Sequence, residues 1–488
     1  MGVTNRASIA LGFEASVGVL PGSPRAIQYP LRGEDFANPL TYDESGEFRP
    51  DRLTTAYDLT AEDCAGGFDV NMRCETFDEL IAASFYADWA AAPTRDNWVT
   101  ASSITGVTAS SGTYAVASGA AFVTGQIIQT LFFDGAANNG VRVLTGGSAT
   151  TAVVGAGAGL VDDGAVSANA RIAVVGFAGA SGDITATSTG LGSTTLDFTT
   201  MTNLVVGGWI KIGGTASGTR FNTAALNTWA RVVSKTNNAV VLDNLPAGWT
   251  TDAGASKTIW IFTSELVTPG TGETKSTLFL NKKIPVTGGF RYLKLYGLHA
   301  RLTQVNTDAR GRMTARFDYQ GIRGDFTSSP DVAAVTPRRS RRPLVSGRSF
   351  VRLHEGGGAF ATTVSVPNIN FILENQLVPV PAAHLLGYED IEPAEATARF
   401  EGNLNFRTDS LYAKYRGSTE TSMSAVLLQD SQAYVIEGPT GLLTTADIPL
   451  PGPNQIINMP FTFTTHANEG AVAANKQYGW HRFRYVEA

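Results

Sequence analysis

The residues that most often perform chemistry are sparse in this chain and stand far apart. The five histidines are scattered, and no His-x-x-x-His or Cys-x-x-Cys spacing occurs in the 488 residues. Zinc sites need ligands at such short spacings. We therefore expect structural histidines and no metal site; the histidines are His299, His354, His384, His466 and His481.

Glycine-rich and acidic stretches also lack the partners that binding loops require. Gly356–Gly358 is not followed by a helix with Lys-Ser/Thr, and Gly155–Gly159 has no helical continuation, so neither is a phosphate loop. Asp162–Gly164 lacks the distal glutamate of a calcium loop. No Gly-x-Ser-x-Gly stretch has the context of a nucleophile elbow. The sequence predicts a protein that is not an enzyme and uses no cofactor.

The composition favours strands and tight turns over several domains. Only 16% of the residues are charged and 52 are glycine, a balance typical of β-rich chains. A length of 488 residues exceeds what one core usually serves. The net charge of −6 and the pI near 5.5 argue against wrapping of nucleic acid. This net charge and pI remain compatible with a surface along which DNA moves without binding tightly.

Cysteine use and hydropathy indicate a cytoplasmic origin. Cys64 and Cys74 cannot form a disulfide framework for a chain of this size. The N-terminal residues lack a basic region followed by an apolar run, so no signal peptide is predicted. No apolar run is long enough to span a bilayer, and we expect no membrane partner.

The best-defined local pattern is a strand followed by a helix at Ala65–Trp89. Apolar and polar residues alternate, so one face is expected to be buried and the other wet. Thr76 is expected to cap a helix, with Glu79 completing a capping box. The apolar positions are Phe68, Val70, Met72 and Cys74, the polar ones Asp69, Asn71 and Arg73, and the helical stripe Phe77, Leu80, Ile81, Ser84 and Phe85.

The same unit returns at Ala398–Gly417. Phe68 corresponds to Phe400 and Thr76 to Thr408, both 332 residues apart. The wet face of this second unit holds Glu401, Asn403, Asn405 and Arg407. Reuse of one unit predicts a duplicated domain. Chance is the alternative, since a strand, a cap and a helix form a common module.

Between the two copies lies a segment of different composition. Residues 97–263 are rich in Gly, Ala, Ser, Thr and Val, and short patterns recur at offsets of 82 to 89. FVTGQIIQ at Phe122 matches LVVGGWIK at Leu204, and ARIAVVG at Ala170 matches KTIWIFT at Lys257. We expect two tandem β modules that interrupt the first copy and are dispensable for its assembly.

These patterns divide the chain into four parts. We expect an N-terminal docking arm at 1–40, a first domain at 41–95 plus 270–335, inserted modules at about 96–178 and 179–269, and a second domain at 345–488. The loop before the second domain contains Arg338, Arg339, Arg341 and Arg342. No aromatic residues interleave with these arginines, so a solvated loop or a pairing with an acidic neighbour is favoured over nucleic-acid binding.

The arrangement resembles the tail tube (major tail) proteins of long-tailed bacteriophages. The similarity lies in GFEASVGVLPGSP (Gly12–Pro24), ESGEFRPDR (Glu44–Arg52) and AGGFDVNMRCETFDELIAASF (Ala65–Phe85), and it covers about 1–95 and 270–488. It implies a mainly β fold: a duplicated tail-tube-type β-sandwich or barrel domain with short flanking helices, plus the inserted pair of small β modules. Family decorations frequently sit at the C-terminus, whereas this insert lies inside the first copy.

The resemblance also implies a function. The chain would be a structural virion protein, assembled in the host cytoplasm into stacked rings that form a hollow tail tube and conduct DNA during ejection. Its partners would be itself, in rings of three (pseudo-sixfold) or six chains, other tail proteins at the tube ends, and double-stranded DNA in transit. Lumen-facing candidates are Asp69, Asn71, Arg73, Glu401, Asn403 and Asn405; contact candidates between subunits or rings are Phe13, Glu14, Arg338, Arg339, Arg341 and Arg342.

Two other classes remain as alternatives. A β-rich surface or adhesin-type binding protein would use 97–263 as its binding modules, but such a protein normally has a signal peptide. A β-solenoid polysaccharide hydrolase would need carboxylates on successive rungs, and the sequence has no such ladder.

Overall fold

The computed structural model describes residues 7–46, 51, 56–270, 275–308, 310–332, 335–337, 341–354, 366–405, 410–450, 452–453, 455–466 and 478–487. The chain is mainly β, as the composition predicts, with 50% strand and 5% helix. Two α-helices, α1 (Asp78–Phe85) and α2 (Ser410–Arg416), occur in this part of the chain.

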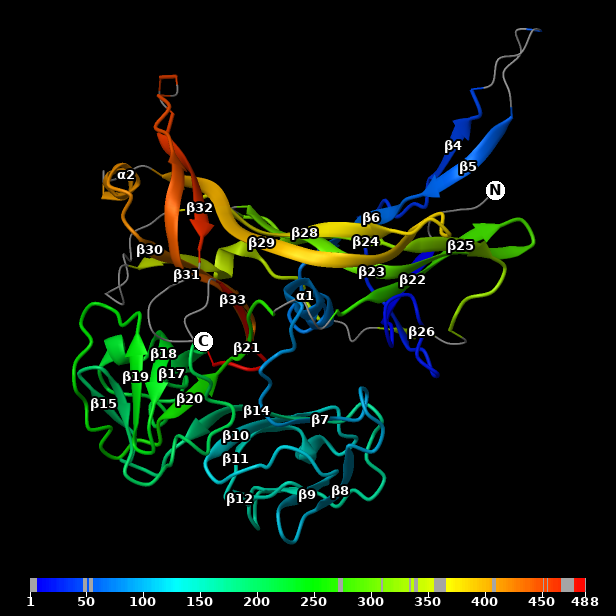
Figure 1. Ribbon diagram of the computed structural model, residues 1–488. Helices are drawn as coiled ribbons and strands as arrows, with labels where there is room; N and C mark the ends of the chain where they lie inside the picture. The colour runs from blue at the N-terminus through cyan, green and yellow to red at the C-terminus, as the bar shows by residue number, and fades with distance from the viewer. Residues whose placement is uncertain are drawn as a thin grey trace.

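Eight antiparallel strands form one continuous wall, to which each half of the chain contributes four. The strands follow one another in the hydrogen-bonded order β3 (Gly33–Glu34), β6 (Cys64–Asn71), β24 (Thr314–Gly321), β23 (Gly289–Asp308), β28 (Asn368–Pro381), β29 (Tyr388–Asn405), β32 (Asn458–Thr465) and β31 (Gln432–Ala446). The wall is a trough (Figure 1): the β31–β32 hairpin rises on one side, and the hairpin of β4 (Leu40–Glu44) and β5 (Tyr57–Glu62) rises on the other.

The two halves share one pairing scheme. In the first half β23 pairs with β22 (Leu278–Val286), β24 and β25 (Arg323–Thr327), and β24 pairs with β6. In the second half β31 pairs with β30 (Thr421–Gln429), β32 and β33 (Gly479–Phe483), and β32 pairs with β29. Facing phenylalanines occupy corresponding places, Phe68 opposite Phe317 and Phe400 opposite Phe463. The scheme fits a duplication, while the domain borders drawn from the sequence stay an interpretation.

Each half has an outer layer beneath its part of the wall. In the first half the outer strands are β26 (Val335–Pro337), β2 (Ala26–Gln28), β1 (Ser8–Phe13), β22 and β25. In the second half they are β27 (Phe350–His354), β30, β33 and β21 (Glu265–Val267). The long strands β23 and β31 pair with both layers. A single apolar core lies between the layers and includes Phe68, Phe317, Phe371, Phe400 and Phe463.

The N-terminal segment belongs to the body of its own chain. β1 and β2 pair with each other, with β22 and with β26, and β3 pairs with β6. The expected docking arm therefore docks on its own subunit over the described residues. β23 and β24 form a hairpin, with its turn after Asp308.

The predicted strand at Ala65 is present as β6, but the predicted capping box is wrong. Helix α1 begins at Asp78 after Phe77 and has no side-chain cap. Thr76 is 1% exposed, and its hydroxyl donates to the carbonyl oxygen of Cys74 instead (3.4 Å). A left-handed residue at Glu75 (φ 59°) turns the chain so that Thr76 enters the core. The helix is buried nearly all round rather than along one stripe; Thr408 lies outside the described residues.

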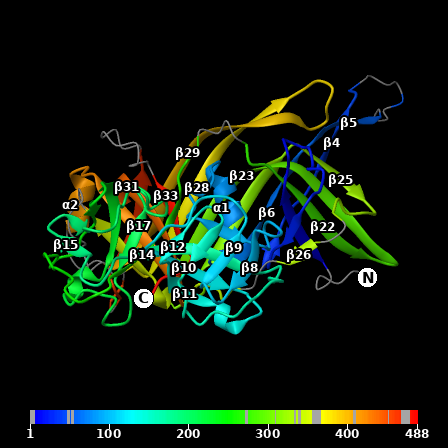
Figure 2. The same cartoon turned by 90° about the horizontal axis from the view of Figure 1, so that it is seen from below.

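The inserted segment is a pair of β modules (Figure 2). One ten-stranded sheet unites β7 (Thr94–Asp96), β10 (Gln126–Leu131), β11 (Gly140–Val143) and β14 (Arg171–Ala178) with β15 (Thr185–Thr187), β16 (Gly190–Gly192), β17 (Trp209–Ile212), β18 (Trp229–Lys235), β19 (Ala239–Asp243) and β20 (Trp260–Thr263). A second sheet holds β8 (Ile104–Thr108), β9 (Thr113–Val116), β12 (Gly146–Gly147) and β13 (Thr151–Val153). The modules join where β14 pairs with β20.

The two modules repeat one another. β10 pairs with β11 and β14, as β17 pairs with β18 and β20, which matches the sequence offsets. Each module also contains an asparagine whose side chain bridges the backbone of a phenylalanine six residues earlier. Asn139 binds the N–H and C=O groups of Phe133, and Asn227 binds those of Phe221.

The insert leaves the first half but rests on the second. Three aromatic residues of the second module, Trp209, Trp229 and Phe262, pack with Val435 and Phe483 in one cluster. The buried Glu437 carboxylate of β31 accepts hydrogen bonds from Trp209 Nε1 (2.5 Å), Arg231 Nε (3.2 Å) and His481 Nε2 (3.0 Å). Deleting the insert therefore uncovers an apolar surface and a buried charge on the second half. Its dispensability for assembly stays a prediction.

Glu437→Gln should loosen the insert, because the buried Arg231 would lose its ion pair with Glu437 and keep the one with Asp243. We expect a loss of about 3 kcal/mol, with faster amide exchange in β17 and β18. Burial raises the pKa of Glu437, but Arg231 and His481 outweigh it and lower this pKa to about 2. The stabilisation is thus complete above pH 4.5 and is lost as the pH falls toward 2.

The matched control is Glu401→Gln. This side chain is 38% exposed, so its ion pair should contribute less than about 1 kcal/mol. If Glu437→Gln were as stable as the wild type and equally protected from exchange, the Glu437 contact would not be what holds the insert.

Candidate functional site: the concave polar face

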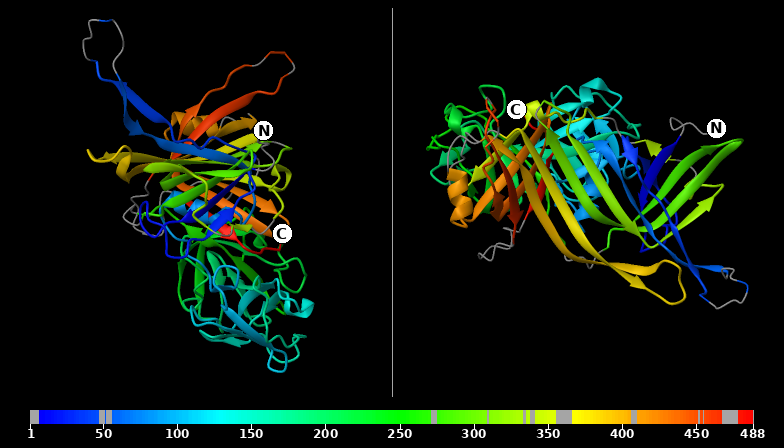
Figure 3. Two further views of the ribbon diagram at one scale, coloured as in Figure 1. Left: turned by 90° about the vertical axis from the view of Figure 1, so that its right-hand side faces the viewer. Right: turned by 90° about the horizontal axis from the view of Figure 1, so that it is seen from above.

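The side of the wall that faces away from α1 and the insert is here called the concave face, and Figure 3 (right) views the wall from this side. Its side chains are mainly polar, with Leu302 and Ile372 as apolar members. Alternation along each strand produces it. In β24 the residues Thr314, Arg316 and Asp318 are partly exposed, while the residues between them are buried. The registers carry this face across the β23–β28 junction, where Asn306 stands opposite Asn370. Both halves therefore contribute to one surface.

The first half holds an arginine among three carboxylates. The Arg316 guanidinium contacts Asp35 (2.6 Å), Asp318 (2.7 Å) and Asp69 (3.5 Å). Burial opposes ionisation of Asp35, but hydrogen bonds from Arg316 and the Gly67 amide outweigh it and lower the pKa of Asp35. The Asp35 carboxylate thus stays charged, and three carboxylates surround one guanidinium.

The second half repeats this cluster in a corresponding place. Arg399 contacts Glu401 (2.6 Å) and Glu374 (3.1 Å). Glu401 is the counterpart of Asp69, since each lies one residue after the phenylalanine that faces another across the strand pair. Burial lowers the pKa of Arg399, and the hydrogen bonds to Glu401 and Glu374 more than reverse it. Neither arginine is left as an unneutralised cation.

Amide side chains also line the concave face. The Asn403 amide and backbone N–H both donate to Asn368 Oδ1 (3.0 Å each). Gln304 donates to Asn306 on β23 (2.8 Å). One further arginine, Arg301, is exposed where a bulge interrupts the β23–β24 register. The face as a whole is hydrogen-bonding and acidic in its paired clusters.

The structure brings five of the six lumen-facing candidates onto the concave face: Asp69, Asn71, Glu401, Asn403 and Asn405. Arg73 lies beyond the end of β6, where its Nη1 atom donates to the carbonyl oxygen of Arg341 (2.9 Å). Their role in a lumen stays a prediction. The sequence analysis did not identify Arg316, Asp318, Glu374 and Arg399, although the same alternation in their strands marks them.

The contact candidates are in mixed environments. Phe13, at the end of β1, is 38% exposed, and Arg342 is exposed. Glu14 accepts hydrogen bonds from Gly18, Thr277 and Gly297, so its carboxylate is already used within the chain. Arg341 pairs with Glu75 (2.8 Å). Arg338 and Arg339 lie outside the described residues.

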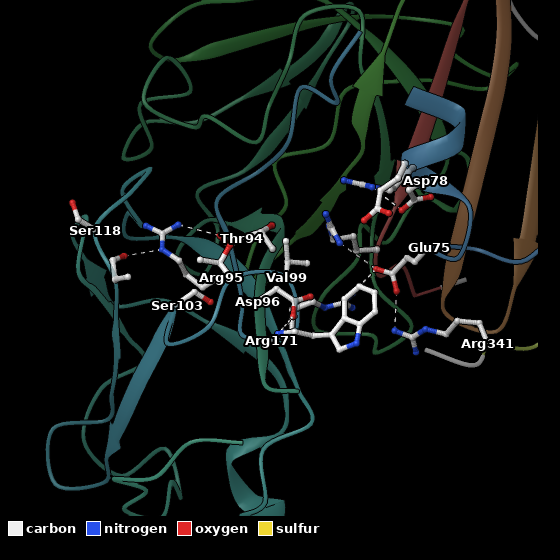
Figure 4. Close-up of a pocket in the computed structure, with 16 residues that line it drawn as sticks. Glu75, Asp78, Thr94, Arg95, Asp96, Val99, Ser103, Ser118, Arg171 and Arg341 are labelled. Carbon is white, nitrogen blue, oxygen red and sulfur yellow. Dashed lines mark hydrogen bonds and ion pairs between the residues drawn. The ribbon is translucent and has the colours of Figure 1, made fainter. Parts of the chain in front are cut away.

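A cavity of about 440 Å³ lies between the start of α1 and the first inserted module (Figure 4). The buried Glu75 carboxylate at its wall accepts from Arg171 (2.8 Å), Arg341 (2.8 Å) and Gln432 (2.7 Å). Burial raises the pKa of Glu75, but Arg171, Arg484 and Arg341 outweigh it, and the net shift is downward. Arg482 pairs with Asp78 (2.6 Å) and with Glu265. These paired charges tie the insert, α1 and β33 together.

Other classes of site receive no support from the described residues. They contain no group of three or more His, Cys, Asp or Glu that could hold a metal ion. None of their helices is long and apolar enough to cross a membrane. No protein-family model matches the chain, and no curated protein is significantly similar to it.

Lysines on the concave face should convert it into a DNA-binding surface. Replacing Glu401, Asn403 and Asn405 by lysine raises the net charge of each chain by four, and the new lysines would release counterions from phosphates. We expect the wild type to bind duplex DNA negligibly at 150 mM salt (about an 8 Å screening length) and the variant to bind with a steep salt dependence.

The control places the same charge change on the insert, at the exposed residues Asp134, Asn237 and Asn238. Binding by this control as strong as that of the concave-face variant would show that net charge alone, and not the concave geometry, decides DNA contact.

Proposed function

We propose that this chain is a structural subunit of a hollow tube, in which rings of the protein stack and double-stranded DNA passes along the concave face. The proposal gives the wall its role as the tube lining and the insert its role as an outer decoration. It assigns the protein to a phage tail, assembled in the host cytoplasm, with other tail proteins at the tube ends. No catalytic role is part of it.

The observation that supports the proposal best is the eight-stranded wall with two open edges. In the part of the chain that the structure describes, β3 pairs only with β6, and residues 442–446 of β31 pair only with β32. A curved sheet with unpaired strands at both ends is closed by further copies of itself, which removes the edges. The acidic, hydrogen-bonding concave face suits a lining that DNA slides past, because it offers phosphates few unpaired cations.

The geometry of closed barrels favours three chains per ring. Strands about 4.8 Å apart and tilted by about 45° give a radius of roughly 26 Å for twenty-four strands. Three chains with eight wall strands each supply this number. A duplex about 20 Å wide, from groove depths near 8 Å, then passes with room for the lining side chains.

The purified protein should form rings or tubes visible by electron microscopy. We expect threefold symmetry with a pseudo-sixfold wall, because the two halves of each chain share one pairing scheme. Native mass spectrometry of the rings should give three chains. Strict sixfold symmetry with six chains would contradict the equal role of the halves, and a protein that stays monomeric at high concentration would contradict the tube itself.

A further inference from the structure

We propose that the ion pair of Glu34 and Lys282 guards one open edge of the wall in the free chain, and that assembly displaces it so that residues 442–447 of the next copy can pair with residues 33–37. This inference rests on the proposed function and adds a control of assembly to it. It follows from the junction that the chain already contains, between β23 and β28.

The open edges are the counterparts of the two strands in that junction. Gly33 pairs with Asp69 as Asn370 pairs with Glu401, so residues 33–37 correspond to 370–374 of β28. Leu443 pairs with Phe463 as Thr303 pairs with Phe317, so the end of β31 corresponds to the end of β23. In this chain the end of β23 pairs with β28. The end of β31 has no such partner among the described residues, and a second copy supplies it.

The internal junction fixes the register of the contact. Thr303 stands opposite Leu373 and Gln304 opposite Ile372. Transferred to the open edges, Leu443 stands opposite Phe36 of the next copy, and Thr445 opposite its Asp35. The faces agree with this register: Leu443 and Phe36 are 6% and 2% exposed, whereas Thr445 and Asp35 are exposed. Apolar side chains thus meet on the core side and polar ones on the concave face.

The Glu34–Lys282 ion pair, here called the guard, binds the backbone groups of Phe36 that pairing with a neighbouring chain would need. The N–H groups of Asp35 and Ala37 donate to β6, so the groups of Phe36 between them point to the open edge. In the free chain the Phe36 N–H donates to Glu34 Oε2 (3.1 Å), and the Phe36 carbonyl accepts from Lys282 Nζ (3.2 Å). Lys282 and Glu34 are themselves 2.8 Å apart. One ion pair therefore satisfies both groups that Leu443 of a neighbour would use.

The internal junction has no such guard. Glu34 stands opposite Phe68, and the residue in the corresponding place, opposite Phe400, is Phe371, which is 3% exposed. A permanent junction has a hydrophobic residue there, and the open edge has a charged one. Charged side chains at sheet edges are a general protection against premature pairing. The charged Glu34 in place of a phenylalanine is therefore what allows the outer edge to stay unpaired until assembly.

Lys282→Gln tests the guard, and Lys283→Gln is its control. Lys283 is the next residue of β22 and lies over the Phe290 ring (3.8 Å), away from Phe36. We expect Lys282→Gln, and independently Glu34→Gln, to assemble about fivefold faster by light scattering, the factor of one net hydrogen bond released. Lys283→Gln should assemble at the wild-type rate. Wild-type rates for both guard variants, or equal acceleration by Lys283→Gln, would overturn the guard.

A disulfide tests the register in the full chain. In the presence of a mild thiol oxidant, Thr445→Cys with Asp35→Cys should join neighbours into a ladder on non-reducing gels that ends at the closed ring. The native thiols do not compete, since Cys64 and Cys74 are buried and burial raises the pKa of Cys64 to about 12. Thr445→Cys with Tyr42→Cys, on the exposed β4–β5 hairpin, should give no ladder.

The outcomes separate this inference from the proposed function. If the Thr445/Asp35 cysteine variant formed tubes without crosslinks, the proposed register would be wrong, but the proposed tube function would stand. Crosslinks at the Tyr42 pair would overturn it as well. A wild-type chain that forms neither rings nor tubes would instead remove the proposed function.

Discussion

The hydrogen bonds between β23 and β28 are the contact on which the whole molecule depends. They join Leu302–Asp308 to Asn368–Glu374 and turn two β-sandwiches into one eight-stranded wall. Without them each half would present four wall strands with two open edges of its own. Their register also aligns the polar residues of both halves, so the concave face is continuous because this junction is in register. Under the proposed function, the same contact supplies the geometry by which further copies extend the wall.

Buried charge provides the second constraint. The insert emerges from the first half and packs on the second, and β21 at its end pairs with β33. Glu75, Glu265 and Glu437 each lie buried against arginines at this boundary. Such pairs contribute little net stability compared with apolar contacts, but separating the partners leaves an uncompensated buried charge. They therefore fix where the insert sits more than they stabilise the fold.

The two surfaces of the wall differ in polarity: the side toward the core is apolar, and the concave face is mainly polar. On the core side, phenylalanines from β6, β24, β28, β29 and β32 pack against one another. On the concave face, Arg316 is held by three carboxylates and Arg399 by two, and amides bind amides. The side chains of this face satisfy one another, so under the proposed function they would offer a passing polyanion few unpaired cations. The open edge at β3 is the exception, where an ion pair borders the apolar core.

Local patterns in the sequence determined the strands and their faces. Alternation at Ala65–Cys74 and at Ala398–Asn405 predicted β6 and the end of β29, including which residues face solvent, because side-chain direction along a strand depends only on the residue's own position. The matched spacing of Phe68 and Phe400 indicated equivalent units, and the pairing scheme agrees with it. The offsets within 97–263 predicted strands that do occupy matching places.

The tertiary structure decided what those strands pair with. Arg316 reaches Asp35 across 281 residues and Glu437 reaches Trp209 across 228, and no local pattern encodes such contacts. The capping box failed for the same reason: the turn at Glu75 and the buried Asp78, held by Tyr434 and Arg482, override the local preference of Thr76. Alternation predicts which face of a strand a side chain lies on, but packing of the whole core determines which strand pairs with which.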